Sequence, residues 1–196
     1  MINENDITNF NRTDNELEEF ILFSIAVAGK TASTTAKNLD RLLWDLGYPS
    51  VSCQSPFSAI WFGLQLDGDE FSETLKNHGF GCYRHRARSF SELIQANLNL
   101  RTCTVNDLEN IYGIGRKTSR FFLLHSRPDV RVAALDTHIL KFMRDHKIIQ
   151  NVPKQTPSSE KRYLELEKAY LDYVGNVNLA EMDLNIWRQY ATRKIS

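Results

Sequence analysis

The sequence has few cysteines and none of the patterns that bind a metal through cysteine. Its three cysteines are Cys53, Cys82 and Cys103, and no two of them form a C-x-x-C pair. Neither a zinc site nor a disulfide framework is therefore indicated. An iron–sulfur cluster needs four cysteine ligands, which this chain cannot supply. We expect the three thiols to be reduced and unbridged, as in a reducing cytoplasm.

Long hydrophobic runs are also missing. No apolar stretch approaches the roughly 20 residues that a membrane-spanning helix needs. The segment 1–15 is polar and acidic and lacks the basic-then-apolar order of a secretion signal. These two absences predict a cytoplasmic protein with no membrane partner.

The chain of 196 residues has no net charge, which by itself argues against a nucleic-acid partner. The charges are, however, unevenly distributed. Residues 1–80 hold 5 Lys and Arg against 12 Asp and Glu, whereas residues 81–150 hold 12 against 6. Because local positive charge attracts a phosphate backbone, the middle segment is the candidate nucleic-acid surface. A solvated basic face would give the same pattern.

No series of alternating strands is present, and the hydrophobic periodicity is helical nearly throughout, which predicts an all-α protein. Asp14 or Asn15 is the expected cap of the first helix, 150–159 is the best linker, and 130–135 could be extended. The expected helices are 15–27, 34–46, 56–64, 69–78, 86–98, 105–112, 116–126, 136–147, 159–175 and 179–193.

The most informative segment is a short turn between two of these helices. Gly113-Ile114-Gly115 follows the helix that contains Leu108, and a new helix starts at Arg116. Glycines permit positive φ and a close backbone approach, and Ile114 would anchor the turn in the core. Backbone N–H groups at such a turn can bind a DNA phosphate. On its own, a Gly-x-Gly between helices is more often an ordinary helix hairpin.

Two polar residues follow the turn. Lys117 lies in the first turn of the new helix, and Asp136 stands just before the helix that contains Ile139 and Leu140. Taken singly, Lys117 would be a solvated lysine and Asp136 the N-cap of its helix, because aspartate is among the preferred capping residues.

Taken together, Leu-Glu-Asn-Ile-Tyr-Gly-Ile-Gly-Arg-Lys-Thr-Ser at 108–119 and Leu-Asp-Thr-His-Ile at 135–139 resemble the signature of the helix-hairpin-helix DNA glycosylase superfamily in its endonuclease III-type form. The resemblance covers roughly 15–147. It implies one two-lobed all-α unit over 1–196, with the active site in the cleft between the lobes. The hairpin lobe would be about 30–147, and the second lobe would combine 14–29 with 159–193.

The resemblance also implies a chemistry. Lys117 would attack C1′ of the target nucleotide and form a Schiff base, so that the strand is cut by β-elimination after the base is lost. A helix N-terminus in a partly dry cleft favours the neutral amine that this attack requires. Asp136 would stabilise the cationic sugar or help to deprotonate Lys117 while still capping its helix. The base must first be flipped out of double-stranded DNA. The protein would then be a monomeric DNA glycosylase and AP lyase of base excision repair.

The same resemblance assigns contacts with DNA and with a cation. Arg84 belongs to a basic cluster with His85, Arg86 and Arg88, which either contacts phosphates or is a solvated helix face. The turn at 28–31 would face DNA, although it lacks the usual large polar residue that fills the gap left by the base. The hairpin carbonyls of Ile111 and Gly113 could hold a monovalent cation, Na⁺ or K⁺. The expected DNA-binding residues are Gly113, Ile114, Gly115, Arg116, Thr118, Lys30, Thr31 and Arg84.

The carboxyl-terminal part departs from the endonuclease III type, because 148–196 contains no cysteine for the iron–sulfur cluster. Instead, 179–194 resembles the end of the compact, cluster-free 8-oxoguanine glycosylases of archaea and some bacteria, although that tail ends in lysine and this chain continues to Ser196. An oxidised base is therefore the expected substrate, with 8-oxoguanine first. The expected base-pocket residues are Trp187, His138, Phe142 and Lys194.

Three alternatives remain at this stage. Trp187 could be an ordinary core residue instead of part of a base pocket. The substrate could be an oxidised pyrimidine or another modified base. The chain could also be a non-catalytic helix-hairpin-helix module that only binds DNA, but such a module would need neither Lys117 nor Asp136.

Overall fold

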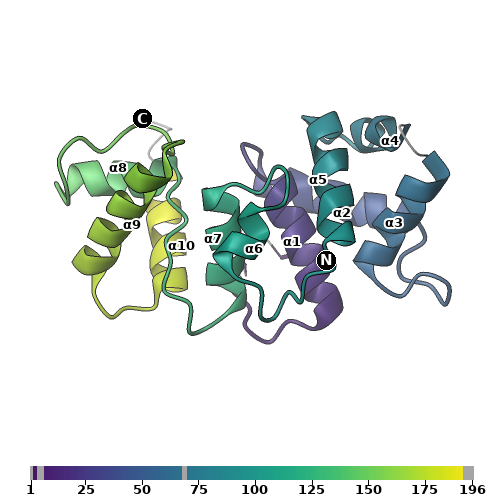
Figure 1. The fold of residues 1–196 in the computed structure, drawn as a ribbon, viewed down its shortest axis with the longest axis horizontal. Helices are drawn as coiled ribbons and strands as arrows, with labels where there is room; N and C mark the ends of the chain where they lie inside the picture. Colours follow the sequence, from purple (N-terminus) through teal and green to yellow (C-terminus); the bar gives the residue numbers. More distant parts are fainter. Residues whose placement is uncertain (1, 4–6, 68–69, 192–196) are drawn as a thin grey trace.

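The computed structural model describes residues 2–3, 7–67 and 70–191, and in these ranges it contains ten α-helices and no strand (Figure 1). The all-α expectation is therefore confirmed. The helices are α1 (Asp14–Ala26), α2 (Ala32–Asp45), α3 (Pro56–Asp67), α4 (Phe71–Asn77), α5 (Tyr83–Gln95), α6 (Val105–Glu109), α7 (Arg116–Ser126), α8 (Thr137–Asp145), α9 (Glu160–Val174) and α10 (Leu179–Ala191). None of these helices is both long and apolar enough to cross a membrane.

The helix ends follow local capping chemistry. The cap of α1 is Thr13, whose side chain accepts a hydrogen bond from the Glu16 backbone in a reciprocal capping box, so the expected cap at Asp14 or Asn15 was wrong. Helix α5 begins at Tyr83 and not at 86, after Cys82 in a left-handed conformation with φ 51°. Helix α6 ends at Glu109 and not at 112, because the hairpin turn starts there.

The first lobe is formed by α1 to α7 around a single hydrophobic core. Helix α1 lies at its centre and is buried on almost every side, with Phe20, Ile21 and Leu22 fully buried. A helix that is apolar all round must be surrounded by other helices, and α1 packs on α2, α3, α5 and α7.

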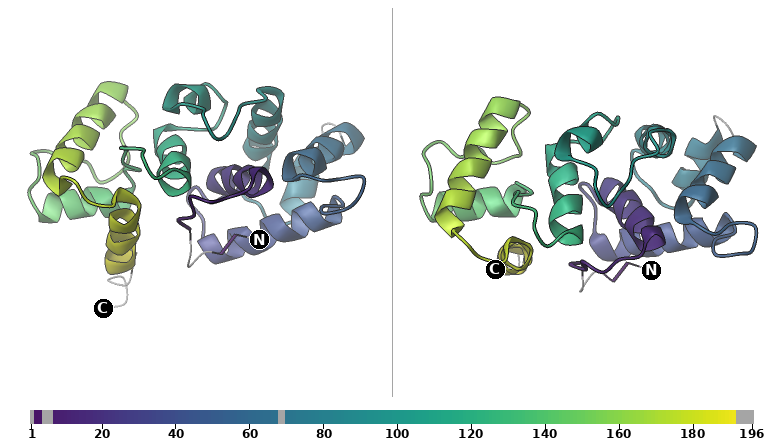
Figure 2. Two further views of the ribbon diagram at one scale, coloured as in Figure 1. Left: turned by 90° about the horizontal axis from the view of Figure 1, so that it is seen from below. Right: turned by 60° about the horizontal axis from the view of Figure 1, so that its bottom comes forward.

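The second lobe is formed by α8, α9 and α10, which stay together in every view of the ribbon (Figures 1 and 2). Its core contains Ile139, Leu140 and Met143 of α8 with Tyr163 and Leu166 of α9. The expected division placed 14–29 with the carboxyl-terminal helices and the α8 segment in the hairpin lobe. Packing divides the chain differently, because α1 fills the core of the first lobe and α8 buries its apolar face against α9 and α10.

Candidate active site

The hairpin between α6 and α7 has the expected turn. Ile114 is buried in the core of the first lobe, and its N–H donates to the Ile111 carbonyl at 3.1 Å. Gly113 has φ +82°, and a Cβ there would overlap the Oγ of Ser89 on α5. Gly115 differs, since its φ is −90° and a Cβ would meet no atom within 4 Å. Of the two glycines, the unbound fold thus requires only Gly113.

The amino terminus of α7 presents free backbone donors. Its N-cap, Gly115, has no side chain, and the N–H of Ser119 is the first that bonds back to the Gly115 carbonyl, at 3.0 Å. The N–H groups of the preceding three residues, 116–118, therefore have no partner within the helix, and the helix dipole gives this end a partial positive charge. Such a terminus can bind a phosphate.

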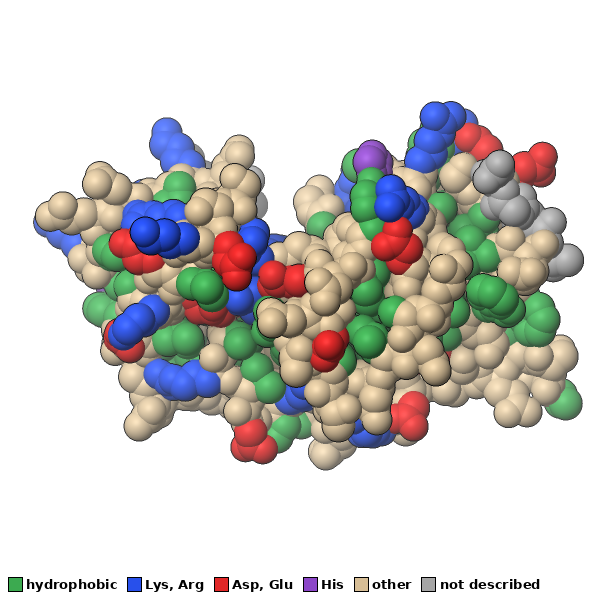
Figure 3. All heavy atoms as spheres, in the orientation of Figure 1, with side chains coloured by type: hydrophobic (Ala, Val, Ile, Leu, Met, Phe, Trp, Pro, Cys, Tyr) green, Lys and Arg blue, Asp and Glu red, His purple; other side chains and the backbone are tan. Residues whose placement is uncertain are grey.

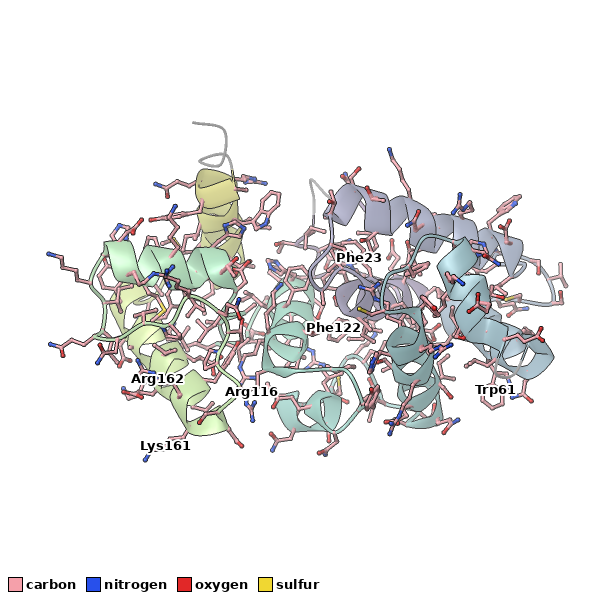
Figure 4. All side chains as sticks on the ribbon, turned by 90° about the horizontal axis from the view of Figure 1, so that it is seen from above. Phe23, Trp61, Arg116, Phe122, Lys161 and Arg162 are labelled. Carbon is pink, nitrogen blue, oxygen red and sulfur yellow. The ribbon has the colours of Figure 1, made fainter. Side chains whose placement is uncertain are left out.

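Two of the expected DNA-binding side chains in this turn are committed elsewhere. The guanidinium of Arg116 donates to the Ser158 carbonyl at 2.9 Å and lies 3.6 Å from the Glu160 carboxylate. Figure 4 shows Arg116 at the boundary of the two lobes, beside α9. The side chain of Thr118 is buried. At these two positions, only the backbone is available to DNA without rearrangement.

Lys117 and Asp136 lie at the lobe boundary, one from each lobe. Lys117 is half-buried in the first turn of α7, with its Nζ 5.9 Å from the ring centroid of Phe121. Asp136 caps α8, and its Oδ1 accepts the N–H groups of His138 at 2.8 Å and Ile139 at 2.9 Å. The capping expectation is confirmed. The second carboxylate oxygen has no hydrogen bond among the described residues and is available for chemistry.

Burial and neighbouring groups act on the pKa of Asp136. Burial raises the pKa of Asp136, and the hydrogen bond from Ile139 and the positive charge of Lys117 act in the opposite direction. The negative charge of Asp183 on α10 raises the pKa of Asp136 further. The charges of Lys117 and Asp183 therefore both reach Asp136.

Three residues near this pair were not anticipated from the sequence. Asp183 Oδ2 lies 3.3 Å from Nε2 of the buried His125, whose Nδ1 is 2.8 Å from Thr8 Oγ1. Tyr170 is buried and its hydroxyl has no hydrogen-bond partner in the described chain. Burial raises the pKa of Tyr170, as do the charges of Asp183 and Asp136. The sequence could have indicated Asp183, because it lies one helical turn before Trp187, an expected base-pocket residue, and so shares its helix face.

The expected base-pocket residues separate in the structure. Trp187 is 48% exposed and meets His138 edge-on, with 6.4 Å between the ring centroids. Trp187 is thus not a core residue. Phe142 is buried in the core of the second lobe and packs edge-on against Tyr170 and Tyr190, and its place in the base pocket stays a prediction. Lys194 lies outside the described residues.

The expected DNA-facing turn is at the surface of the first lobe. Lys30 and Thr31 are exposed at the start of α2 and line a cavity of about 120 Å³. Arg84 is exposed as well. Arg86 differs, because its buried guanidinium donates to the carbonyls of Ala26, at 2.5 Å, and Gly81, so it cannot contact phosphates as part of the basic cluster.

The other members of the basic cluster lie beside the hairpin. His85 stacks on Tyr112 with 5.9 Å between the ring centroids, and the guanidinium of Arg88 lies 3.8 Å from the centroid of the same ring. Both side chains are exposed. In the space-filling view, basic and histidine side chains lie along the upper edge of the molecule, where a notch separates the two lobes (Figure 3).

Comparison with known proteins identifies a common family. A family model for 8-oxoguanine DNA glycosylases matches residues 4–179. The 8-oxoguanine DNA glycosylase/AP lyase of Methanocaldococcus jannaschii is 33% identical over 135 residues, which cover 63% of this chain and 64% of that protein. That of Thermotoga sp. (strain RQ2) is 41% identical over 113 residues, which cover 54% of this chain and 53% of that protein. The matches thus span less than two thirds of these relatives.

Two crystal structures share the fold. The 8-oxoguanine DNA glycosylase of Methanocaldococcus jannaschii superposes with a TM-score of 0.65 at 26% identity, over 93% of this chain and 82% of that one. The 8-oxoguanine DNA glycosylase of Thermotoga maritima superposes with a TM-score of 0.64 over 93% and 84%, and at 21% identity it supports the fold alone. The expected helix-hairpin-helix glycosylase fold is confirmed.

Proposed function

This chain belongs to the 8-oxoguanine DNA glycosylase family, and we propose that it removes an oxidised base from double-stranded DNA and then cuts the strand at the abasic site. The observation that carries the proposal is the pairing of Lys117, in the first turn of α7, with Asp136, at the start of α8. A module that only binds DNA would have no use for this pair.

The chemistry follows from the two groups. The neutral amine of Lys117 attacks C1′ of the flipped nucleotide, and the bond between C1′ and the base nitrogen breaks as the base leaves. The sugar ring opens to a Schiff base with Lys117. Loss of a proton from C2′ then expels the 3′ phosphate by β-elimination, and water releases the enzyme from the product.

Asp136 contributes a negative charge where the sugar becomes cationic. Its Oδ1 accepts two backbone N–H groups of α8, which hold the carboxylate in one orientation. Burial raises the pKa of Asp136, and before Lys117 loses its proton the positive charge of Lys117 acts in the opposite direction and favours the carboxylate. A carboxylate held in this way stabilises developing positive charge without reorganising.

Recognition of DNA would combine the backbone donors at 116–118 with exposed cationic side chains, among them Lys30 and Arg84. The base is proposed to be 8-oxoguanine, as in the names of the relatives, with Trp187 and His138 as the aromatic groups that contact it. The monovalent cation also stays a proposal. The Ile111 carbonyl accepts one N–H and keeps a second lone pair for such an ion. We further propose that the protein acts as a monomer in the cytoplasm.

Borohydride trapping tests the central step, because reduction of the Schiff base makes the enzyme–DNA link permanent. Wild-type protein should be trapped on a duplex with an abasic site, and Lys117→Ala should not, while retaining binding. Lys141→Ala, at an exposed lysine on α8, is the matched control and should trap normally. Equal trapping of the Lys117→Ala variant would show that another amine is the nucleophile. Binding without trapping by the wild type would favour a non-catalytic module, and a panel of single-lesion duplexes would identify the base.

A further inference from the structure

A group of charged and polar side chains, all buried except the half-buried Glu109, joins the two lobes. It consists of Glu109 of α6, Arg120 of α7, and Tyr163 and Glu167 of α9, and is called the interlobe cluster below. Arg120 is 5% exposed, Glu167 is 7% exposed and Tyr163 is fully buried. Burying charges is costly unless they are well paired. Here the charge of Arg120 is paired with the carboxylates of Glu109 and Glu167.

Arg120 connects both lobes through one guanidinium. Its Nε donates to Glu167 Oε1 at 2.8 Å, its Nη1 donates to a carboxylate oxygen of Glu109, and its guanidinium lies 4.6 Å from the centroid of the Tyr163 ring. The same Nη1 donates to the Arg116 carbonyl at 3.2 Å. The guanidinium thus contacts the first turn of α7, which carries the proposed nucleophile.

The two α9 side chains hold the backbone that leads to Asp136. Glu167 Oε1 accepts the N–H of Ala133 at 2.8 Å as well as the bond from Arg120. Tyr163 Oη accepts the N–H of Leu135 at 3.0 Å and donates to the Ala133 carbonyl at 2.8 Å. The segment forms no sheet, so α9 side chains satisfy backbone groups that a neighbouring strand would otherwise pair. The α9 side chains therefore help to hold this segment, together with Thr156, whose Oγ1 donates to the Leu135 carbonyl at 2.7 Å.

We propose that the interlobe cluster sets the separation and orientation of Lys117 and Asp136. On one side it contacts the turn that bears the lysine, and on the other it holds Ala133 and Leu135, which lie three residues and one residue before the aspartate. Glu167 and Tyr163 are then positioning residues, which act through the backbone and touch no substrate. The effects on reaction rate that this inference predicts rest on the proposed function. Misplacement of a reacting group by about 1 Å can slow a reaction about 100-fold.

The test uses two substitutions that conserve shape. Glu167→Gln removes the charge that pairs with Arg120, and Tyr163→Phe removes the hydroxyl that binds the 133–135 backbone. The assay is single-turnover cutting of a duplex that already contains an abasic site, because this substrate bypasses recognition of the base. We expect each variant to cut about 10- to 100-fold more slowly, with its affinity for an abasic-analogue duplex changed less than about twofold.

The control for lost stability is Leu75→Ala, at a fully buried position on α4, the helix that Figure 1 places far from α9. This variant should lose stability and still cut at the wild-type rate at temperatures where it is folded. If Glu167→Gln and Tyr163→Phe do the same, the residues are structural only and the proposal is wrong.

Hydrogen exchange provides a measurement that does not depend on activity. In the free protein, both variants should speed exchange of the Ala133 and Leu135 amides about tenfold or more, whereas Leu75→Ala should not affect these two amides selectively. If the wild type neither cuts nor traps abasic DNA, the proposed function fails and the exchange result alone decides. Faster exchange then supports the interlobe cluster as the group that holds this segment, and unchanged exchange overturns it.

Discussion

Alanine at Gly113 and at Gly115 should separate the folding of the hairpin from its binding of DNA. At Gly113, with φ +82°, an L side chain costs about 1–2 kcal/mol. The new Cβ would also overlap Ser89 Oγ and lie 3.2 Å from Ser89 Cβ, and overpacking of this kind costs about 1–3 kcal/mol. Gly113→Ala should therefore lower the free energy of unfolding by about 2–5 kcal/mol, which corresponds to roughly 5–15 °C in Tm.

Gly115→Ala should leave the stability almost unchanged. Its backbone is extended, and the new Cβ meets no atom within 4 Å. Alanine restricts the unfolded chain, a gain of about 0.4–1 kcal/mol, and is a poorer N-cap by several tenths of a kcal/mol, so the two effects nearly cancel. Because Gly115 is the N-cap of α7, the new Cβ would, however, add bulk next to the free N–H groups. Loss of a hydrogen bond to a charged phosphate costs about 1.5–3 kcal/mol, so the affinity for DNA should fall about 10- to 100-fold.

Thermal unfolding followed by circular dichroism, and fluorescence anisotropy with an abasic-analogue duplex, measure the two effects separately. The double variant Gly113→Ala with Ser89→Ala should recover part of the lost stability, because the overlap with Oγ is removed while the backbone strain remains. Wild-type affinity in Gly115→Ala would mean that the hairpin backbone does not approach a phosphate. A Tm loss in Gly115→Ala as large as that in Gly113→Ala would refute the structural reasoning.

Three further predictions concern charge. Asp136→Asn should keep the cap of α8 and the Tm, since asparagine caps as well as aspartate. It should lower the rate of single-turnover cutting by orders of magnitude, and a normal rate would leave Asp136 only its capping role. Burial and the charge of Glu19 raise the pKa of Asp40 to about 6, so the folded state favours the neutral acid. Denaturant titrations should then show the free energy of unfolding falling by about 1–2 kcal/mol as the pH rises from about 4 to 6, a magnitude reduced because Asp40 is partly exposed. Asp40→Asn should remove this pH dependence. Finally, each neutralised phosphate contributes about 0.9 to the slope of log affinity against log salt; a slope of about −3 to −5 would fit a few contacts, and a slope near zero would exclude them.

The sequence by itself determined the elements that depend on local chemistry. Helical periodicity predicted the ten helices of the described chain, although several of their ends differ by a few residues. The hairpin around Ile114 and the cap at Asp136 were also predictable, because a turn and a cap are formed by residues close together in the chain. The spacing of Lys117 and Asp136 within a known motif was enough to suggest covalent chemistry on DNA.

Other assignments needed the tertiary structure, because periodicity places a residue on a helix face without naming the partner of that face. Arg86 looked like its exposed neighbour Arg84 until the packing of α5 turned its guanidinium toward the carbonyls at the end of α1. Phe142 lies on an apolar face that fits a base pocket or a core equally well, and only the packing of α8 against α9 and α10 made it a core residue.

The division into lobes and the surroundings of the reacting pair were likewise decided in three dimensions. Helix α1 joins the first lobe because it is apolar on nearly every side, but the helices that surround it come from distant parts of the chain. Arg120 and Glu167 are 47 residues apart, and neither is unusual in its local sequence. Their hydrogen bond forms only once the two lobes have packed, because Arg120 is on α7 of the first lobe and Glu167 on α9 of the second.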